Sequence, residues 1–368
     1  MRVVFCGGGT AGHITPAISI AETILAHHPD SKILFIGRSS GDENHLVTRR
    51  GFDLKEIEIH GIKRSLSIKN IELIRTLFKA IKQSKELLKL FNPNIVIGTG
   101  GYVSWPVLKA AQSLKIPTLI HESNAYPGLT TRTLAPKCDR VLINFPECKN
   151  YLKNKTNVRI VGNPIRKAFF EYSRASARKE LGIKPTAFFV LSLGGSGGSE
   201  VINNQVINLM KSYSVKQSDV IHIHASGKRY FEEIRKSNPE LIESQNGTRI
   251  IPFIENMALY TCAADIIICR CGAMTLSEIS CAECVPILIP SPNVTDNHQY
   301  KNGKVFSDKG AAILLEESEL TERSLIDAVN YLKRETVQRK RMASKLSTLH
   351  NPNCLNLIYR EIEEIASN

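Results

Sequence analysis

Short runs of β-branched and aromatic residues alternate with longer segments of helical periodicity through the first half of the chain. Strands are predicted at residues 2–6, 32–37, 95–98, 118–121, 141–144 and 158–161, and helices near residues 15–27, 43–50, 70–90, 104–114 and 128–134. The strands are apolar along their whole length rather than alternating. Such strands, separated by helices, are typical of a parallel sheet that is covered on both faces.

The pattern breaks at residues 162–164, Gly-Asn-Pro, and starts again after a polar stretch that ends near Pro185. Further strands are predicted at residues 188–193, 220–224, 249–253, 266–269 and 286–290. A chain of 368 residues is too long for one ordinary core. We therefore expect an α/β protein of two doubly wound, Rossmann-like domains facing across a cleft, with boundaries at 1–163 and 164–345 and a C-terminal helix at 346–368 that packs back toward the first domain.

Three glycine-rich loops follow predicted strands, at residues 7–13, 98–101 and 194–198. Glycine lets a ligand approach the backbone, and the start of a helix attracts phosphate. The first loop satisfies the G-x-G-x-x-G dinucleotide pattern, but the second strand ends at residues 36–38, Ile-Gly-Arg, without the acidic residue that binds a ribose. Three loops in two halves favour a diphosphate ligand held by both domains. Each loop alone could equally be a tight turn.

Charge and cysteine content limit the possible partners and the cellular location of the protein. The 48 basic residues exceed the 35 acidic ones and give a net charge of +13, which suggests either an anionic partner or a basic solvated surface. No stretch of 18 apolar residues occurs, and the apolar start is too short for a secretion signal, so we expect a cytoplasmic protein. Nine cysteines fit reduced core thiols. Cys269, Cys271, Cys281 and Cys284 could suggest zinc, but their place in a buried strand-to-helix unit favours core packing.

Polar residues cluster where predicted strands end. They are His121 to Asn124, Arg166, Glu278 and the segment 296–299, Asp-Asn-His-Gln. Carboxylate and amide groups suit sugar hydroxyls, and a guanidinium suits phosphate. The alternative for Glu278 is charge complementation at a helix start, and for the segment 296–299 it is helix capping. No D-x-D sequence is present, so neither a metal ion nor a cofactor is expected.

Several of these motifs together resemble the MurG family, the peptidoglycan glycosyltransferases of bacteria; they lie at residues 8–16, 100–104, 121–124, 162–166, 194–196, 269–278 and 296–299. The resemblance is collinear and covers nearly the whole chain. It implies the two-domain GT-B fold. It also implies inverting transfer of N-acetylglucosamine from UDP-N-acetylglucosamine to the C4 hydroxyl of the muramoyl sugar of lipid I, an undecaprenyl-pyrophosphoryl-muramoyl peptide. The product would be lipid II, made at the cytoplasmic face of the cell membrane. Nucleic acid would not be a partner.

The resemblance implies a set of residues that contact UDP-N-acetylglucosamine: Thr10, Ala11, Gly12, Asn124, Arg166, Ser196, Ile254, Ala273, Met274, Thr275, Leu276, Ser277, Glu278 and Gln299. Within this set it assigns Glu278 to the ribose hydroxyls, Gln299 to the sugar hydroxyls and the backbone of Ile254 to the uracil. Four places depart from the family pattern. Trp105 stands where a small residue is frequent, and His298 stands where some relatives have glutamine. Gly197 replaces a larger residue, and Glu283-Cys284-Val285 stands where a glycine is expected.

His13 is the candidate catalytic base, because inverting transfer needs a group that takes the proton of the acceptor hydroxyl. A helix start disfavours imidazolium, so the neutral ring can accept that proton. The alternatives are a hydrogen-bond donor to phosphate or acceptor, and a histidine that merely begins a helix.

The segment 68–90 is a candidate membrane-surface patch. It combines apolar and basic residues, which with the preceding basic pair are Ile71, Ile74, Leu77, Phe78, Ile81, Lys63, Arg64, Lys69, Arg75, Lys79, Lys82 and Lys85. Such a pattern suits an anionic inner-leaflet surface, and Trp105 could join it. The alternative is a helix that packs its apolar face on the sheet.

Rival functions for the whole chain are a UDP-N-acetylglucosamine 2-epimerase, an NADP-dependent oxidoreductase and a non-catalytic nucleotide-binding module.

Overall fold

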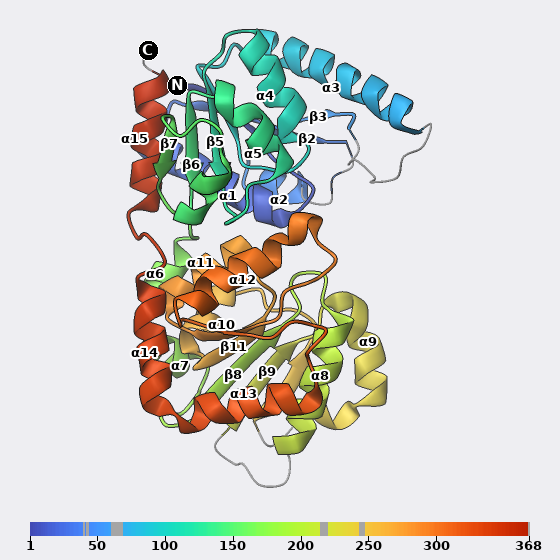
Figure 1. Ribbon diagram of the computed structural model, residues 1–368, viewed down its shortest axis with the longest axis vertical. Helices are drawn as coiled ribbons and strands as arrows, with labels where there is room; N and C mark the ends of the chain where they lie inside the picture. The colour runs from blue at the N-terminus through green and yellow to red at the C-terminus, as the bar shows by residue number, and fades with distance from the viewer. Residues whose placement is uncertain (40, 42–43, 60–68, 214–219, 243–246, 367–368) are drawn as a thin grey trace. The chain divides into compact units, whose positions relative to one another are not determined.

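The computed structural model describes the chain except for residues 40, 42–43, 60–68, 214–219, 243–246 and 367–368 (Figure 1). It divides into two units. Unit 1 comprises Met1–Ile165 and Asn351–Asn368, and unit 2 comprises Arg166–His350. The chain therefore passes from one unit to the other twice, after Ile165 and after His350.

Unit 1 is built on a parallel sheet of seven strands in the order β3-β2-β1-β4-β5-β6-β7. The strands are β1 (Arg2–Cys6), β2 (Lys32–Arg38), β3 (Asp53–Ile57), β4 (Ile95–Gly98), β5 (Thr118–Glu122), β6 (Arg140–Ile143) and β7 (Val158–Ile160). Side chains alternate across the central strand β1. Val3 and Phe5 join one core cluster, Val4 and Cys6 join another, and all four are fully buried. Both faces of the sheet are therefore covered, which explains why its strands are apolar throughout.

The helices of unit 1 lie on these two faces (Figure 1). They are α1 (Ala11–His27), α2 (Asn44–Thr48), α3 (Lys69–Phe91), α4 (Ser104–Ser113), α5 (Leu129–Leu134) and α15 (Cys354–Ala366), with short 3₁₀ turns η1 (Ala135–Lys137) and η2 (Pro146–Tyr151). The last helix, α15, packs against α1 and buries Ile358 and Ile362 in the same core as Phe5. Arg140 on β6 donates to Glu361 on α15 over 2.6 Å.

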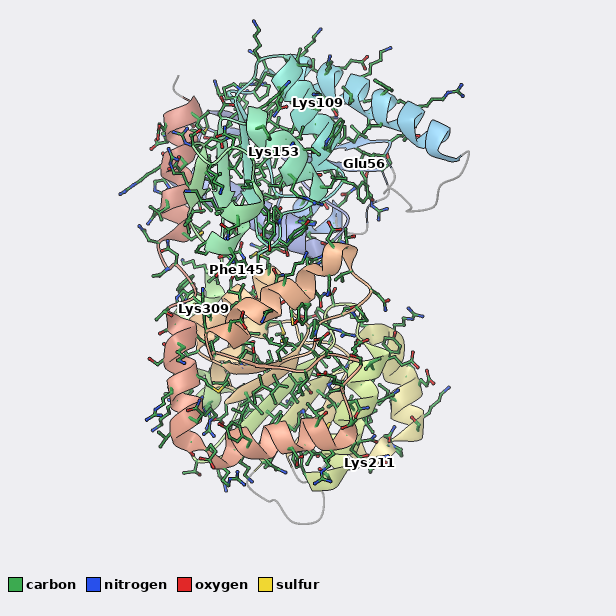
Figure 2. All side chains as sticks on the ribbon, in the orientation of Figure 1. Glu56, Lys109, Phe145, Lys153, Lys211 and Lys309 are labelled. Carbon is green, nitrogen blue, oxygen red and sulfur yellow. The ribbon has the colours of Figure 1, made fainter. Side chains whose placement is uncertain are left out.

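Unit 2 repeats this plan with six parallel strands in the order β10-β9-β8-β11-β12-β13. The strands are β8 (Phe188–Leu193), β9 (Val220–Ala225), β10 (Thr248–Ile251), β11 (Ile266–Cys269), β12 (Val285–Leu288) and β13 (Ile313–Leu314). The helices are α6 (Ala168–Glu171), α7 (Arg174–Glu180), α8 (Glu200–Tyr213), α9 (Lys228–Ser237), α10 (Met257–Ala263), α11 (Ala273–Ala282), α12 (His298–Asp308), α13 (Glu322–Arg334) and α14 (Thr336–Ser347), with 3₁₀ turns η3 (Pro239–Leu241) and η4 (Thr295–Asn297). Charged side chains such as Lys211 on α8 lie at the surface (Figure 2).

Unit 2 contains a buried cluster of charged side chains around Asp265, which precedes β11. Its carboxylate accepts from the Arg178 guanidinium over 2.6 Å and from the Phe189 backbone N–H over 2.9 Å. Arg174 also pairs with it, and Arg339 lies 3.5 Å away. Asp265 and Arg178 are both less than a tenth exposed, so each depends on the other for compensation of its charge.

The two parallel sheets confirm the α/β class and the doubly wound architecture that the sequence predicts. Two strands were not predicted, β3 and β13. Both are edge strands, and β3 has the sequence Asp-Leu-Lys-Glu-Ile with a mostly exposed burial pattern, so it lacks the apolar run that marked the others. Helix α1 begins at Ala11, earlier than predicted, and carries Pro16 inside it.

All nine cysteines are free thiols, and eight of them are buried. Burial raises the pKa of Cys269 and of the partly exposed Cys281 to about 12, so both are neutral thiols at physiological pH. Within the described ranges, no group of three or more His, Cys, Asp or Glu side chains could hold a metal ion. The helices in those ranges are all too short or too polar to cross a bilayer.

Candidate functional site

In each unit the strand order reverses at one point, between β1 and β4 in unit 1 and between β8 and β11 in unit 2. Ligands of doubly wound sheets bind outside the carboxyl ends of the strands at such a point. The segments that follow these four strands, comprising loops and the first turns of helices, are residues 7–13, 99–101, 194–198 and 270–278. The glycine loops, His13 and Glu278 therefore lie where this rule puts a ligand, each within its own unit.

His13 stands in the first turn of α1 and is partly exposed. Its Nδ1 lies 3.1 Å from the carbonyl oxygen of Thr99, the residue that follows β4. A carbonyl can only accept, so Nδ1 carries the proton. In the neutral ring, Nε2 is then the atom with the lone pair, and it can accept a proton. Thr99 also donates its hydroxyl to the His13 carbonyl over 2.6 Å, which holds the helix start from a second side.

The two glycines after Thr99 shape the space around the imidazole. Gly100 has φ +107°, and a Cβ built on it would lie 2.6 Å from His13 Nδ1. Gly101 has φ +79°, and its Cβ would lie 2.0 Å from the carbonyl oxygen of Gly8. Neither position tolerates a side chain without displacement, because both the backbone angle and the space exclude one. The turn after β4 is thus fitted to His13 and to the first glycine loop.

Thr10, Ala11 and Gly12 form the start of α1, with Thr10 and Gly12 exposed. Asn124 lies beyond β5 and is held by Glu122. One oxygen of Glu122 accepts from the backbone N–H and the side-chain amide of Asn124, both over 3.0 Å.

The other oxygen of Glu122 accepts from the Gly128 N–H over 3.0 Å and from the Thr131 hydroxyl over 2.6 Å. This buried carboxylate therefore fixes the loop that carries Asn124, a role that the sequence did not reveal.

Unit 2 contains a pocket of about 360 Å³ beside its glycine loop. It is lined by Gly194, Gly198, Ser199, Glu200, Val201, Tyr230, Arg270, Ser291, Asn293, Gln299 and Glu317. Gln299 at the start of α12 accepts from the Ser291 N–H over 2.9 Å, which fixes its carboxamide at the pocket wall. Ser196 is exposed at the tip of the loop, where Gly195 and Gly198 have φ +92° and +75°.

Arg166 and Glu278 face each other in unit 2. The Arg166 Nε donates to Glu278 over 2.6 Å, and the guanidinium also lies over the Phe169 ring. Burial raises the pKa of the Glu278 carboxyl above its ordinary value of 4.5, and the charge of Arg166 opposes that rise. The structure thus brings together two residues that the sequence assigned separately, one to phosphate and the other to ribose.

The remaining predicted contacts lie in two segments of unit 2. Ile254 is buried in the loop after β10, so only its backbone is suited to reading a base. In the first turns of α11, Ala273, Met274, Leu276 and Ser277 are buried, and the Ser277 hydroxyl bonds back to the Ala273 carbonyl over 3.1 Å. A ligand of this segment would therefore meet the backbone at the helix start more readily than these side chains.

Helix α3 presents only part of the predicted membrane patch. Leu77 and Ile81 pack against the core, as Trp105 does, so these three follow the alternative of sheet packing. Phe78 is 68% exposed. Lys63, Arg64 and Ile68 lie outside the described residues, as do the side chains of Lys69, Ile71 and Ile74.

Four basic residues of α3 lie on the same face as Phe78, whereas the exposed Lys79 donates to Glu58 over 2.6 Å. Arg75, Lys82 and Lys89 are exposed and Lys85 is half-buried. With Phe78 they recur at alternating spacings of three and four residues, the repeat of one helix face.

Comparison with known proteins adds the family. The model of the glycosyltransferase family 28 N-terminal domain matches residues 3–143, and that of its C-terminal domain matches residues 189–356. The chain is 40% identical, over all of its length and 99% of the relative, to the UDP-N-acetylglucosamine–N-acetylmuramyl-(pentapeptide) pyrophosphoryl-undecaprenol N-acetylglucosamine transferase of Acetivibrio thermocellus.

Solved structures agree. The crystal structure of MurG from Acinetobacter baumannii matches with a TM-score of 0.78 and 26% identity over 99% of both chains. A UDP-GlcNAc 2-epimerase from Neisseria meningitidis matches with a TM-score of 0.69, at 15% identity over 99% of this chain and 100% of its own, which shows a common fold alone. Since both family 28 domains and a full-length relative match, the chain belongs to glycosyltransferase family 28 and, within it, to the MurG family of N-acetylglucosamine transferases.

Proposed function

We propose that the protein transfers N-acetylglucosamine from UDP-N-acetylglucosamine to the C4 hydroxyl of the muramoyl sugar of lipid I and so forms lipid II. The observation that carries this proposal is the 40% identity, over the whole chain, to a transferase whose name states this donor and this type of acceptor. The likeness to a 2-epimerase is too distant to favour an epimerase reaction.

Unit 2 is proposed to bind the donor. Its pocket joins the glycine loop with Gln299, which suits a diphosphate next to sugar hydroxyls. Glu278 would accept hydrogen bonds from the ribose, the backbone of Ile254 would read the uracil, and the start of α11 would add N–H donors. An anionic diphosphate near Arg166 would compete with Glu278 for the guanidinium, so donor binding would share or break the 2.6 Å contact between them.

Unit 1 is proposed to supply the base. His13 Nε2 takes the proton of the acceptor C4 hydroxyl while that oxygen attacks the anomeric carbon of the donor. The new C–O bond forms on the face opposite the departing UDP, so the configuration inverts as the bond to the diphosphate oxygen breaks. The hydrogen bond from Nδ1 to Thr99 supports this role, because it keeps the proton off Nε2 in the neutral ring. Thr10, Ala11, Gly12 and Asn124 are proposed to contact the donor from this unit.

A transfer assay tests the reaction. UDP release is measured from UDP-N-acetylglucosamine with and without a soluble lipid I analogue, and the sugar products are identified. We expect UDP release only with the acceptor. Acceptor-independent release together with epimerised sugar would support the 2-epimerase instead.

The His13→Ala variant tests the base in the same assay. General-base catalysis contributes about 10²–10⁴-fold, so we expect the turnover rate to fall in that range with UDP affinity little changed. His45→Ala, which removes an exposed histidine of the same unit, serves as the control. Unchanged turnover in His13→Ala would remove His13 as the base.

The exposed face of α3 is proposed to hold the enzyme at the cytoplasmic face of the cell membrane. Arg75, Lys82, Lys85 and Lys89 would attract anionic headgroups, and Phe78 would enter the interface. This contact would bring unit 1 to a substrate that is anchored by a polyprenyl chain.

Co-sedimentation with vesicles that contain anionic lipid tests this surface. The K82E/K89E variant should lose most binding, since each cation near such a surface contributes about 1 kcal/mol and each reversal also adds a repulsion. The control is K137E/K153E, which makes the same charge change at exposed positions elsewhere on unit 1. Equal loss in both variants would point to net charge rather than to α3.

A further inference from the structure

Arg270 is the first residue after β11, at the point where the strand order of unit 2 reverses. The sequence assigned it no role. Its side chain is 15% exposed and forms part of the wall of the pocket beside the glycine loop. One guanidinium nitrogen, Nη2, donates to the Ser199 hydroxyl over 2.6 Å, and the other, Nη1, donates to the Ile289 carbonyl over 3.2 Å. Glu317 pairs with the same guanidinium.

Ser199 is the residue that joins the glycine loop to α8. Its hydroxyl accepts from the Ile202 N–H over 3.4 Å, and its carbonyl accepts from the Asn203 N–H over 2.8 Å. Gly194 packs so closely on it that a Cβ at Gly194 would lie 2.3 Å from the Ser199 backbone nitrogen. A side chain that fixes Ser199 therefore fixes both the end of the loop and the first turn of the helix.

A corresponding contact is present in unit 1, between the residue after β4 and the start of α1. Thr99 is the first residue after β4, as Arg270 is after β11, and it binds the start of the helix that follows the first strand through His13. In both units, the residue after the fourth strand thus fastens the helix that leaves the first strand. In unit 1 this contact orients the proposed base, and in unit 2 the corresponding contact orients the end of the glycine loop.

We propose that Arg270 is a positioning residue for the donor diphosphate: it holds Ser199, and through it the 194–199 loop, in the conformation that receives the phosphates. The inference rests on the proposed function of the donor pocket. Its guanidinium acts through Ser199 rather than on the phosphates, because Ser199, Ile289 and Glu317 already engage it. Glu317 neutralises the cation and restrains it. A planar fork suits donation in two directions at once, and a lysine ammonium cannot reproduce it.

The test is calorimetric titration of the full-length protein with UDP and, separately, with uridine, which lacks the diphosphate. The variants are Arg270→Lys, Ser199→Ala and the two combined. Arg323→Lys is the control, since Arg323 is exposed on α13. Thermal unfolding of each variant checks that it folds. We expect Arg270→Lys to weaken UDP about 10-fold, as the loss of a charge-assisted hydrogen bond would, with little change for uridine.

Because both residues act in one chain of contacts, the double variant should bind UDP about as weakly as Arg270→Lys alone. The inference would be overturned if the affinity losses of the two single variants multiplied in the double variant. It would also be overturned if Arg270→Lys weakened the binding of UDP and of uridine equally. Unchanged UDP affinity in Ser199→Ala would show that Arg270 does not act through Ser199. If Arg270→Lys does not fold, the Ser199→Ala variant is decisive. Weaker binding of UDP with unchanged binding of uridine would support the inference, and unchanged binding of UDP would overturn it. Failure of the unaltered protein to bind UDP would instead overturn the proposed function itself, and the inference with it.

Discussion

Replacing Gly100 by alanine should inactivate the enzyme by moving His13, with the rest of unit 1 in place. The new Cβ would lie 2.6 Å from His13 Nδ1 and 2.9 Å from Cε1, whereas ordinary van der Waals contact begins at 3.4 Å. The imidazole must therefore move by roughly 1 Å or the turn must open. Either change lengthens the 3.1 Å contact from Nδ1 to Thr99 beyond hydrogen-bond range. A reacting group misplaced by about 1 Å can cost on the order of 100-fold in rate.

The substitution also strains the backbone, because Gly100 has φ +107°. Gly51→Ala separates the two effects. Gly51 belongs to the same unit and has φ +77°, but a Cβ there meets nothing within 4 Å. Each variant should lose about 1–2 kcal/mol of stability from the left-handed backbone alone. Only Gly100→Ala should also lose turnover.

The assay is UDP release at saturating donor and acceptor analogue, measured together with urea unfolding of both variants. We expect turnover of Gly100→Ala to fall about 100-fold, while Gly51→Ala stays near the unaltered rate. Turnover of Gly100→Ala within threefold of Gly51→Ala would refute the argument that the turn after β4 sets the position of the base.

Three further predictions concern unit 2. Burial raises the pKa of the Glu278 carboxyl above 4.5, so the folded protein binds the carboxyl proton more tightly than the unfolded chain does. The contribution of this carboxyl to stability therefore falls as the pH rises from 4.5 through the raised pKa. Glu278→Gln should flatten this slope and raise the unfolding temperature at neutral pH, yet weaken UDP more than 2′,3′-dideoxy-UDP in titration. Asp265→Asn leaves the Arg178 charge buried and should cost about 3–5 kcal/mol in urea unfolding; a loss below about 1 kcal/mol would contradict the ion cluster. Gly197→Ala meets open space and should stabilise by about 0.5 kcal/mol. Gly198→Ala, whose Cβ would lie 2.3 Å from the Ser226 carbonyl, should destabilise in the same assay.

The fold was largely predictable because its strands are buried on both faces. Apolar runs such as residues 188–193 and 266–269 became strands with those bounds. The polar strand β3 was not predicted, because it lacks an apolar run and is a strand only through its pairing with β2. Glu283 shows a different limit. It takes φ +53° at the end of α11, a left-handed position that glycine usually fills, so the sequence shows glutamate where the backbone conformation is one typical of glycine.

The candidate site was predictable only in its motifs. Glycine loops and lone polar residues at strand ends can be read from a sequence, and His13 and Glu278 are of this kind. Their partners cannot be, because Thr99 lies 86 residues from His13, and Arg166 lies 112 residues from Glu278. Glu122, Arg270 and Ser199 were missed for the same reason. Their roles are contacts made by the folded chain, and no local pattern encodes them.

The two reversal points share one topology, but the residue after the fourth strand fastens the neighbouring helix start through different groups: a backbone carbonyl in unit 1 and a side-chain guanidinium in unit 2. In unit 1 that residue offers its carbonyl, which can only accept, so it draws the proton of His13 to Nδ1 and makes Nε2 the basic nitrogen. In unit 2 it offers a guanidinium, which can only donate, and this group donates to the Ser199 hydroxyl at the end of the glycine loop. Since the carbonyl of Thr99 belongs to the backbone, the contact in unit 1 depends on the conformation of the turn after β4, whereas the contact in unit 2 depends on the side chain at position 270. Replacing Arg270 is therefore expected to disturb unit 2 directly, while unit 1 is more sensitive to a change in its turn, such as Gly100→Ala.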